Sequence, residues 1–199
     1  MGCLTFLFIL QRLQYNDCPD STQSYTLWKQ YLVDYETKYW PPPSWTVNRY
    51  TGVLDENWAF TLNKALFVGI NLVGGEVHDT TEWATRQAAN LEWIAVQVSA
   101  ARKNKDLEVL VVFAHADPSI PTNDPYFVPF FDNVQSSYKV PTVLVHRNLG
   151  IDSANMQENY MGINDFAVLV VQGGIWPPMR VEIDTESGSF IWNQADWFV

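Results

Sequence analysis

Apolar residues in this sequence gather in short runs that polar turns and longer mixed segments separate. The run 107–118, LEVLVVFAHADP, is the most informative, because six of its first seven residues are apolar and only Glu108 is not. β-Branched and aromatic residues favour a strand, and a strand without a polar face is typical of the centre of a sheet. We therefore expect a buried central strand near 107–114, followed directly by His115 and Asp117.

Other apolar runs predict further strands of the same sheet. The run 65–73, ALFVGINLV, is expected to be a second central strand. It should pair with 58–62 in a hairpin around Asn63 and Lys64, because asparagine tolerates the positive φ of a tight turn. Runs at 4–10 and 141–145 predict two more core strands. Three strands at 166–171, 179–183 and 189–192 are expected to follow and to run antiparallel.

Apolar residues spaced three and four apart predict helices at 21–35 and 80–101, and a third helix begins near Asn123. Asp79 is placed to cap the second helix, with Glu82 in the position of a capping box. The order strand, helix, strand over 65–114 predicts a βαβ unit with parallel neighbours. The fold class is therefore α/β tending to α+β, with a mixed sheet flanked by helices in a single domain, 1–199.

Charge and composition limit the classes of molecule that this chain is expected to bind. The formal net charge is −10, and the 12 basic residues are scattered along the chain. Nucleic acids and anionic membranes need clusters of Lys and Arg, so the charge disfavours both as partners, and we expect no nucleic-acid partner. The nine Trp, nine Tyr and eleven Phe suit a large core and also a protein-binding surface. Two cysteines form neither a disulfide framework nor a zinc site.

The apolar N-terminal run 3–10, CLTFLFIL, has two interpretations, a buried strand or the remnant of a targeting segment. It lacks a basic leader and a small-residue cleavage site, so we expect no intact signal peptide. It is also far shorter than the roughly 20 residues that span a bilayer, so we expect no transmembrane segment. We favour the buried strand. A soluble or peripheral protein fits this interpretation, and the compartment stays undetermined.

Polar residues with metal-binding chemistry follow the predicted strands. They are His115, Asp117, His146 and Asn148. If these strand ends converge, their side chains suit a binuclear phosphoesterase site, which uses Asp, His and Asn ligands. The alternative is that each histidine makes only local hydrogen bonds. Asp117 precedes Pro118, a pattern that is typical of a turn.

The order of several short motifs resembles the calcineurin-like metallophosphoesterase family. GINLVGG, EVHD, EWATRQAANLEW and VLVVFAHADPS follow one another at similar spacing, and the resemblance covers roughly Tyr15 to His146. It implies that His115 is the metal-binding histidine of the family's fourth motif. It also implies that the first two metal motifs would lie before residue 1. The chain would then be an incomplete metallophosphoesterase-like sandwich that lacks its N-terminal βα units.

Carried over residue by residue, the resemblance implies a degenerate metal site. The third motif is replaced by Gln11, Arg12, Leu13 and Gln14, with Leu13 where an asparagine ligand would stand. The fifth motif is reduced to the sequence from His146 to Asn148, without the expected pair of histidines. His115 is then a vestigial ligand. We expect Leu10–Gln14 and His115 to lie near one another at the carboxyl end of the sheet.

Two functions follow from this resemblance. In the first, the domain is catalytically inactive, holds no metal cofactor, and serves as a binding or structural subunit among other protein subunits. No small-molecule substrate is identified for it. In the second, the chain is the C-terminal portion of an active phosphoesterase that uses a divalent metal pair. We favour the first, because the substitutions at 11–14 lie within this chain.

Overall fold

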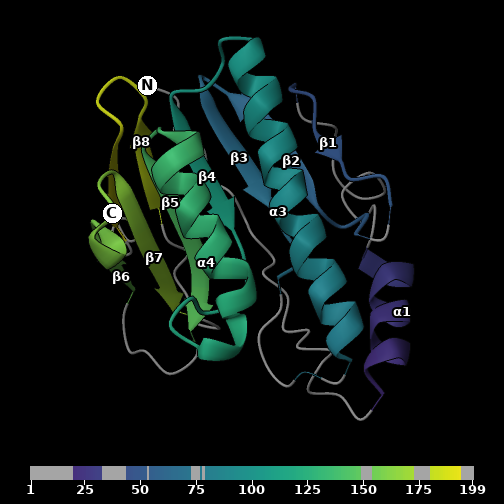
Figure 1. Ribbon diagram of the computed structural model, residues 1–199. Coiled ribbons are helices and arrows are strands. Elements are labelled where there is room, and N and C mark those ends of the chain that lie inside the picture. The colour runs from purple at the N-terminus through teal and green to yellow at the C-terminus, as the bar shows by residue number, and fades with distance from the viewer. Residues whose placement is uncertain are drawn as a thin grey trace.

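The fold is built around one mixed sheet of seven strands in the order β1-β2-β3-β4-β5-β7-β6 (Figure 1). The computed structural model describes residues 20–32, 44–52, 54–72, 77, 79–148, 154–172 and 180–193. The strands are β1 Asn48–Arg49, β2 Trp58–Leu62, β3 Ala65–Gly69, β4 Val109–Phe113, β5 Thr142–Asn148, β6 Asn155–Gln157 and β7 Phe166–Gln172. The predicted α/β fold with a mixed sheet is confirmed.

Helices and a second, smaller sheet complete the architecture. The helices are α1 Ser21–Leu32, α3 Thr80–Lys103 and α4 Asp124–Asn133, with short helical turns at Pro121–Asn123, Val134–Tyr138 and Tyr160–Gly162. The small sheet pairs β8 Arg180–Asp184 with β9 Ser189–Asn193 in antiparallel register. Among the described helices, none combines the length and the apolar character that crossing a lipid bilayer requires.

Strand β4 is the middle strand of the large sheet, and all of its residues are buried. It runs parallel to β3 on one side and to β5 on the other. This position explains why its sequence has no polar face, and the predicted central strand is confirmed. Strands β3 and β4 are joined through α3, so the predicted βαβ unit is confirmed as well.

The hairpin β2–β3 turns at the predicted residues. Asn63 and Lys64 have φ values of 49° and 65°, the left-handed conformation that a tight hairpin needs. Across the hairpin, Gly69 pairs with Trp58. A Cβ atom at position 69 would lie 2.2 Å from Cε2 of the Trp58 indole, so only glycine fits beneath this ring.

Helix α3 begins at the residue that the sequence predicted. The Oδ1 atom of Asp79 accepts hydrogen bonds from the backbone N–H groups of Thr81 at 2.8 Å and Glu82 at 3.0 Å. These bonds satisfy two of the donors that a helix start leaves free. The carboxylate of Glu82 turns instead to Arg86, one helical turn later. The predicted cap at Asp79 is therefore confirmed.

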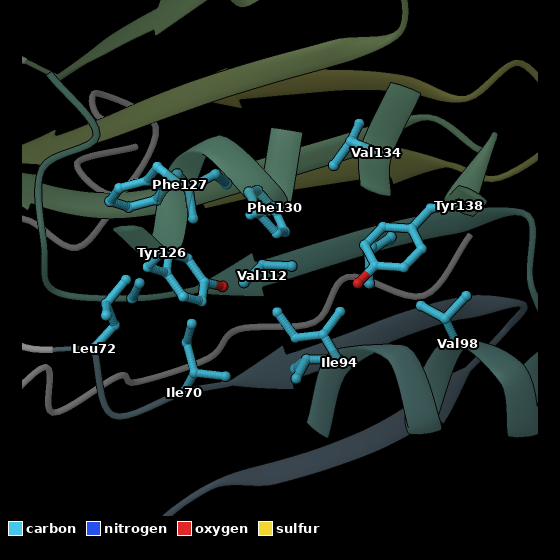
Figure 2. Packing of buried hydrophobic residues seen from close by; sticks show 14 of the residues in the cluster. Ile70, Leu72, Ile94, Val98, Val112, Tyr126, Phe127, Phe130, Val134 and Tyr138 are labelled. Carbon is cyan, nitrogen blue, oxygen red and sulfur yellow. The ribbon is translucent and has the colours of Figure 1, made fainter. Parts of the chain in front are cut away.

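Helices α3 and α4 lie side by side over one face of the sheet (Figure 1). Their buried side chains interleave with those of β3, β4 and β5 (Figure 2). In α4, Tyr126, Phe127 and Phe130 are fully buried, and their rings contact one another. Aromatic contacts of this kind add to the free energy of burial and fix how the helix sits on the sheet.

The opposite face of the large sheet carries a second apolar layer. Phe67 of β3, Val111 of β4 and Val143 of β5 alternate with the residues that face the helices, as the two-residue period of a strand requires. Side chains of the β8–β9 hairpin pack against this layer, among them Ile183 and Trp192. The large sheet is therefore covered on both faces.

Several boundaries and one orientation differ from the predictions. Strand β7 runs parallel to β5 and antiparallel to the short β6, so the expectation of antiparallel pairing is wrong for the β5–β7 pair and right for β8 and β9. Strand β3 ends at Gly69 because Asn71 turns its backbone N–H to a side chain rather than to the ladder. Strand β5 continues to Asn148, and helix α1 ends at Leu32. The predicted strand 4–10 lies outside the described residues.

Candidate functional site

Polar residues gather where the parallel strands β3, β4 and β5 end. Asn71 follows β3, and His115 and Asp117 follow β4. His146 lies near the carboxyl end of β5. Because the strands are parallel neighbours, their carboxyl ends meet at the same edge of the sheet. Ligand sites of α/β proteins are most often found at this edge. We therefore treat the carboxyl edge as the candidate site.

The loop after β4 is hydrogen-bonded to both neighbouring segments, the one after β3 and strand β5. The backbone N–H groups of His115 and Ala116 both donate to the carbonyl oxygen of Leu72, at 3.1 Å and 2.9 Å. On the other side, the N–H of Ala114 donates to the carbonyl oxygen of Val145 at 3.0 Å. These bonds hold the backbone of His115 at the centre of the edge, and its side chain is half-buried there.

Asp117 is a turn residue. Its Oδ1 atom accepts hydrogen bonds from the backbone N–H of Ser119 at 2.8 Å and from the Ser119 hydroxyl at 2.6 Å. The carbonyl oxygen of Asp117 in turn accepts a bond of 2.8 Å from the side-chain amide of Asn123. This pattern ties the loop to the start of α4. The interpretation of Asp117 as a turn-former before Pro118 is confirmed.

His146 is buried inside the protein. Strand β5 extends past the predicted boundary, so His146 is part of the strand and is only 2% exposed. Burial lowers the pKa of this imidazole, and the negative charge of Asp117 offsets part of the effect. Within the part of the chain that the structure describes, its Nδ1 atom has no hydrogen-bond partner. His146 is therefore held neutral at the helix-covered face of the sheet.

The burial of His146 predicts how stability changes with pH. Below about pH 6.5 the imidazole of the unfolded chain binds a proton that the folded chain excludes, so the free energy of unfolding falls as the pH falls. We expect His146→Gln to remove this contribution. Between pH 7 and pH 5, urea unfolding should show a larger fall in the free energy of unfolding for wild type than for the variant. Equal losses in both proteins would contradict the buried, neutral state.

The comparison with a variant is needed because two carboxylates act in the opposite direction. Burial raises the pKa of Glu56 and of Glu82. Each therefore binds a proton more readily in the folded chain than in the unfolded chain, so each makes stability rise as the pH falls. The difference between wild type and His146→Gln cancels these shared contributions and isolates the histidine.

Arg147 places a permanent positive charge at the same edge. Its side chain is only 8% exposed, which is rare for arginine. Strand β5 is the parallel neighbour of β4, so Arg147 near the end of β5 lies at the same edge of the sheet as His115. A guanidinium stays charged at all physiological pH values. The edge that carries His115 therefore also carries a permanent positive charge.

A closed ring of three asparagines lies at the same edge, between β2, β3 and α3. The side-chain amide of Asn57 donates to Oδ1 of Asn90 at 2.7 Å, and the amide of Asn90 donates to the carbonyl oxygen of Asn71 at 3.0 Å. The N–H of Asn71 completes the ring by donating to Oδ1 of Asn57 at 2.7 Å. Asn57 and Asn90 are fully buried. Within the ring, each of these donors and acceptors therefore bonds to another asparagine in place of water.

The asparagine ring extends outward to a carboxylate and a tyrosine. The side-chain amide of Asn71 donates to Glu56, and the Tyr25 hydroxyl lies 2.9 Å from both carboxylate oxygens of Glu56. Burial and the neighbouring Glu56 charge raise the pKa of Tyr25 well above its ordinary value, so its hydroxyl keeps its proton and donates. Sequence analysis missed these residues. The one local signal was Asn90, a polar residue on the apolar face of α3.

The structure describes only some of the residues that the sequence singled out. Gln11, Arg12, Leu13 and Gln14 lie outside the described residues, so their expected approach to His115 stays a prediction. Asn148 is the last residue of β5. Within the described ranges, no group of three or more His, Cys, Asp or Glu side chains is placed to hold a metal ion. The edge instead joins His115, His146 and Arg147 on one side to the asparagine ring on the other.

Comparison with known proteins adds no assignment to this geometry. A scan against protein-family models finds no match, and a search of curated proteins finds no match either.

Proposed function

We propose that this chain is a metallophosphoesterase-like domain that does not hydrolyse phosphate esters and that serves as a binding or structural subunit of a protein assembly. The observation that carries this proposal is the buried guanidinium of Arg147 near the end of β5, at the same edge of the sheet as the strand-end histidine His115. The order of sequence motifs around His115 supports the proposed resemblance to metallophosphoesterases. Arg147 supports the proposal that the chain does not hydrolyse phosphate esters.

The argument from Arg147 is electrostatic. A catalytic pair of divalent cations carries about four positive charges, which anionic bridging ligands normally offset. A fixed positive charge at the edge that carries His115 acts in the opposite direction. The interaction between charges is stronger in a buried, low-dielectric setting than in water. An edge with a buried guanidinium is therefore a less favourable place for a metal pair.

The other polar groups at the edge are already engaged in the protein's own hydrogen bonds. The carboxylate of Asp117 accepts two bonds from Ser119, and the carboxylate of Glu56 accepts bonds from Asn71 and Tyr25. A metal ion bound by either carboxylate would compete with hydrogen bonds that hold a loop or a helix in place. This arrangement is typical of a structural polar network and supports a role in which the edge stabilises the fold.

The proposed subunit role is supported by apolar side chains that the described surface exposes. Met161 is 71% exposed and Ile191 is 62% exposed, and they lie on different elements. Met161 also has a left-handed backbone, with φ at 54°, which costs free energy in a residue other than glycine. An exposed methionine held in an unfavourable conformation suits a contact with another protein.

The test of lost catalysis is a phosphoesterase assay on the purified full chain. We expect no turnover of p-nitrophenyl phosphate or bis(p-nitrophenyl) phosphate with added Mn²⁺ above the level of the His115→Ala variant. Wild-type turnover that His115→Ala abolishes would overturn the proposal and favour the active enzyme instead.

The test of the subunit role is the mass of the protein in its native source. We expect the gently extracted chain to migrate well above its own mass of 22.8 kDa and to co-purify with other chains in a fixed ratio. A monomer that elutes alone at that mass would contradict the subunit role and leave the assay result unaffected.

A further inference from the structure

The outer side of helix α4 carries an exposed apolar side chain between two carboxylates. Asp124, Val128 and Asp132 follow one another at intervals of four residues, so they lie in one row along the helix. Val128 is 54% exposed, and both aspartates are exposed as well. The helix lies on the sheet through its buried aromatic side chains (Figure 1). The row is therefore open to solvent.

A second exposed apolar side chain is presented by the turn Tyr160–Gly162. The Tyr160 ring lies 5.9 Å, centre to centre, from the ring of Phe131, which is three residues after Val128 on α4. This contact places the turn against the helix, and Met161 in the turn is 71% exposed. We call the exposed Val128 and Met161, with the half-buried Phe131 and Tyr160 that connect their elements, the α4 patch.

The charged residues in the two segments that form the α4 patch are all acidic. Segments 119–138 and 154–172 contain no Lys, Arg or His. Their acidic residues, all of them exposed, are Asp124, Asp132, Glu158 and Asp165. The guanidinium of Arg102, on α3, bonds to the carbonyl oxygens of Ser137 and Tyr138, which lie past the carboxyl end of α4. The α4 patch is therefore apolar at its centre and negative around it.

We propose that the α4 patch docks a basic, amphipathic segment of another protein. Apolar side chains of that segment would cover Val128 and Met161, and its Lys or Arg side chains would pair with the surrounding carboxylates. Complementary charge of this kind steers encounter and selects the partner. A second copy of this chain would bring like charges together, because its formal net charge is −10. This inference rests on the proposed subunit role and names the chemistry of the partner.

The probe for this inference is a short synthetic amphipathic helix of Leu and Lys, added to the ¹⁵N-labelled full chain and followed by NMR. We expect saturable shift changes at 124–132 and 158–165 that weaken between 50 mM and 500 mM NaCl, because salt screens exposed charges. A peptide with Glu in place of every Lys should not bind. The double variant Val128→Ser, Met161→Ser should weaken binding about tenfold, because it removes apolar surface that the peptide would bury.

The matched control is Val96→Ser on helix α3. Val96 is 51% exposed and follows Glu92 by four residues, so it repeats the spacing of Val128 after Asp124. This variant should bind the Leu–Lys peptide as wild type does. Equal binding of the two peptides would overturn the inference, as would shift changes spread evenly over the acidic surface.

Self-association is the third contradicting outcome. If sedimentation velocity shows a dimer of wild type that the double variant Val128→Ser, Met161→Ser abolishes, the occupant of the α4 patch is a second copy and the inference is wrong. The mass of the native assembly tests the subunit role separately. A native assembly of fixed composition, together with a peptide that does not bind at the α4 patch, would overturn this inference and leave the subunit role standing.

Discussion

Replacing Phe130 with alanine is expected to destabilise the protein by about 4 kcal/mol, because a fully buried aromatic side chain leaves a cavity as well as losing its burial. Phe130 has no exposed surface. Its ring lies within 6.5 Å, centre to centre, of the rings of Tyr126, Phe127, Tyr138 and Phe166. Its loss therefore removes contacts that join α4 to β7 as well as contacts within the helix region.

The measurement is urea unfolding followed by circular dichroism, with the midpoint and the slope fitted together. Val128→Ala is the control, because Val128 lies on the same helix and is exposed. We expect the control to change the free energy of unfolding by less than about 0.5 kcal/mol. A loss below about 1 kcal/mol for Phe130→Ala would show that α4 does not pack on the sheet as described.

Replacing Asn90 with alanine is expected to cost about 3 kcal/mol. The change leaves the buried side-chain amide of Asn57 without its acceptor, and it removes the bond that the part-buried carbonyl oxygen of Asn71 accepts. Each unsatisfied buried group costs about 1–3 kcal/mol. The loss should therefore exceed what alanine substitution costs at an ordinary polar position of a helix.

The control for the ring is Asn104→Ala, at the end of the same helix. Asn104 is exposed and contributes its backbone N–H, which alanine keeps. Urea unfolding of both variants separates the ring from the general effect of losing an asparagine. Equal changes in the two variants would mean that the ring contributes no stability.

Much of the fold could be predicted because its signals are local. The central strand β4 follows from a run of apolar residues, and the β2–β3 turn follows from Asn63. The start of α3 follows from Asp79 and its bonds within the next three residues. Each of these features depends on residues that are neighbours in the sequence. The interactions that form a turn, a helix cap or a buried strand act between such neighbours.

The missed features depend on residues that are far apart in the chain. Strand β7 was expected to run antiparallel with the strands that follow it, yet it pairs in parallel with β5, a partner that the packing of the whole sheet determines. The ring of Asn57, Asn71 and Asn90 joins three elements, and no spacing in the sequence indicates that they meet. His146 was placed after a strand because its polarity suggested a boundary, whereas the strand continues through it.

The candidate site was predicted in part. Sequence analysis pointed to the carboxyl edge through His115 and His146, and the structure places both residues at that edge. It did not anticipate that Arg147 would be buried at the same strand end. An arginine after a histidine in sequence carries no signal of its burial, because that depends on the layer packed against β5.

The measurement that tests the central claim most directly is the titration of the metal-free full chain with Mn²⁺, followed by electron paramagnetic resonance. The account predicts that free Mn²⁺ rises from the first addition and that no spin-coupled pair forms, because Arg147 adds a positive charge at the edge and the carboxylates of Asp117 and Glu56, among the described residues, accept the protein's own hydrogen bonds. Two tightly bound equivalents with a coupled spectrum, both lost in His115→Ala, would contradict it.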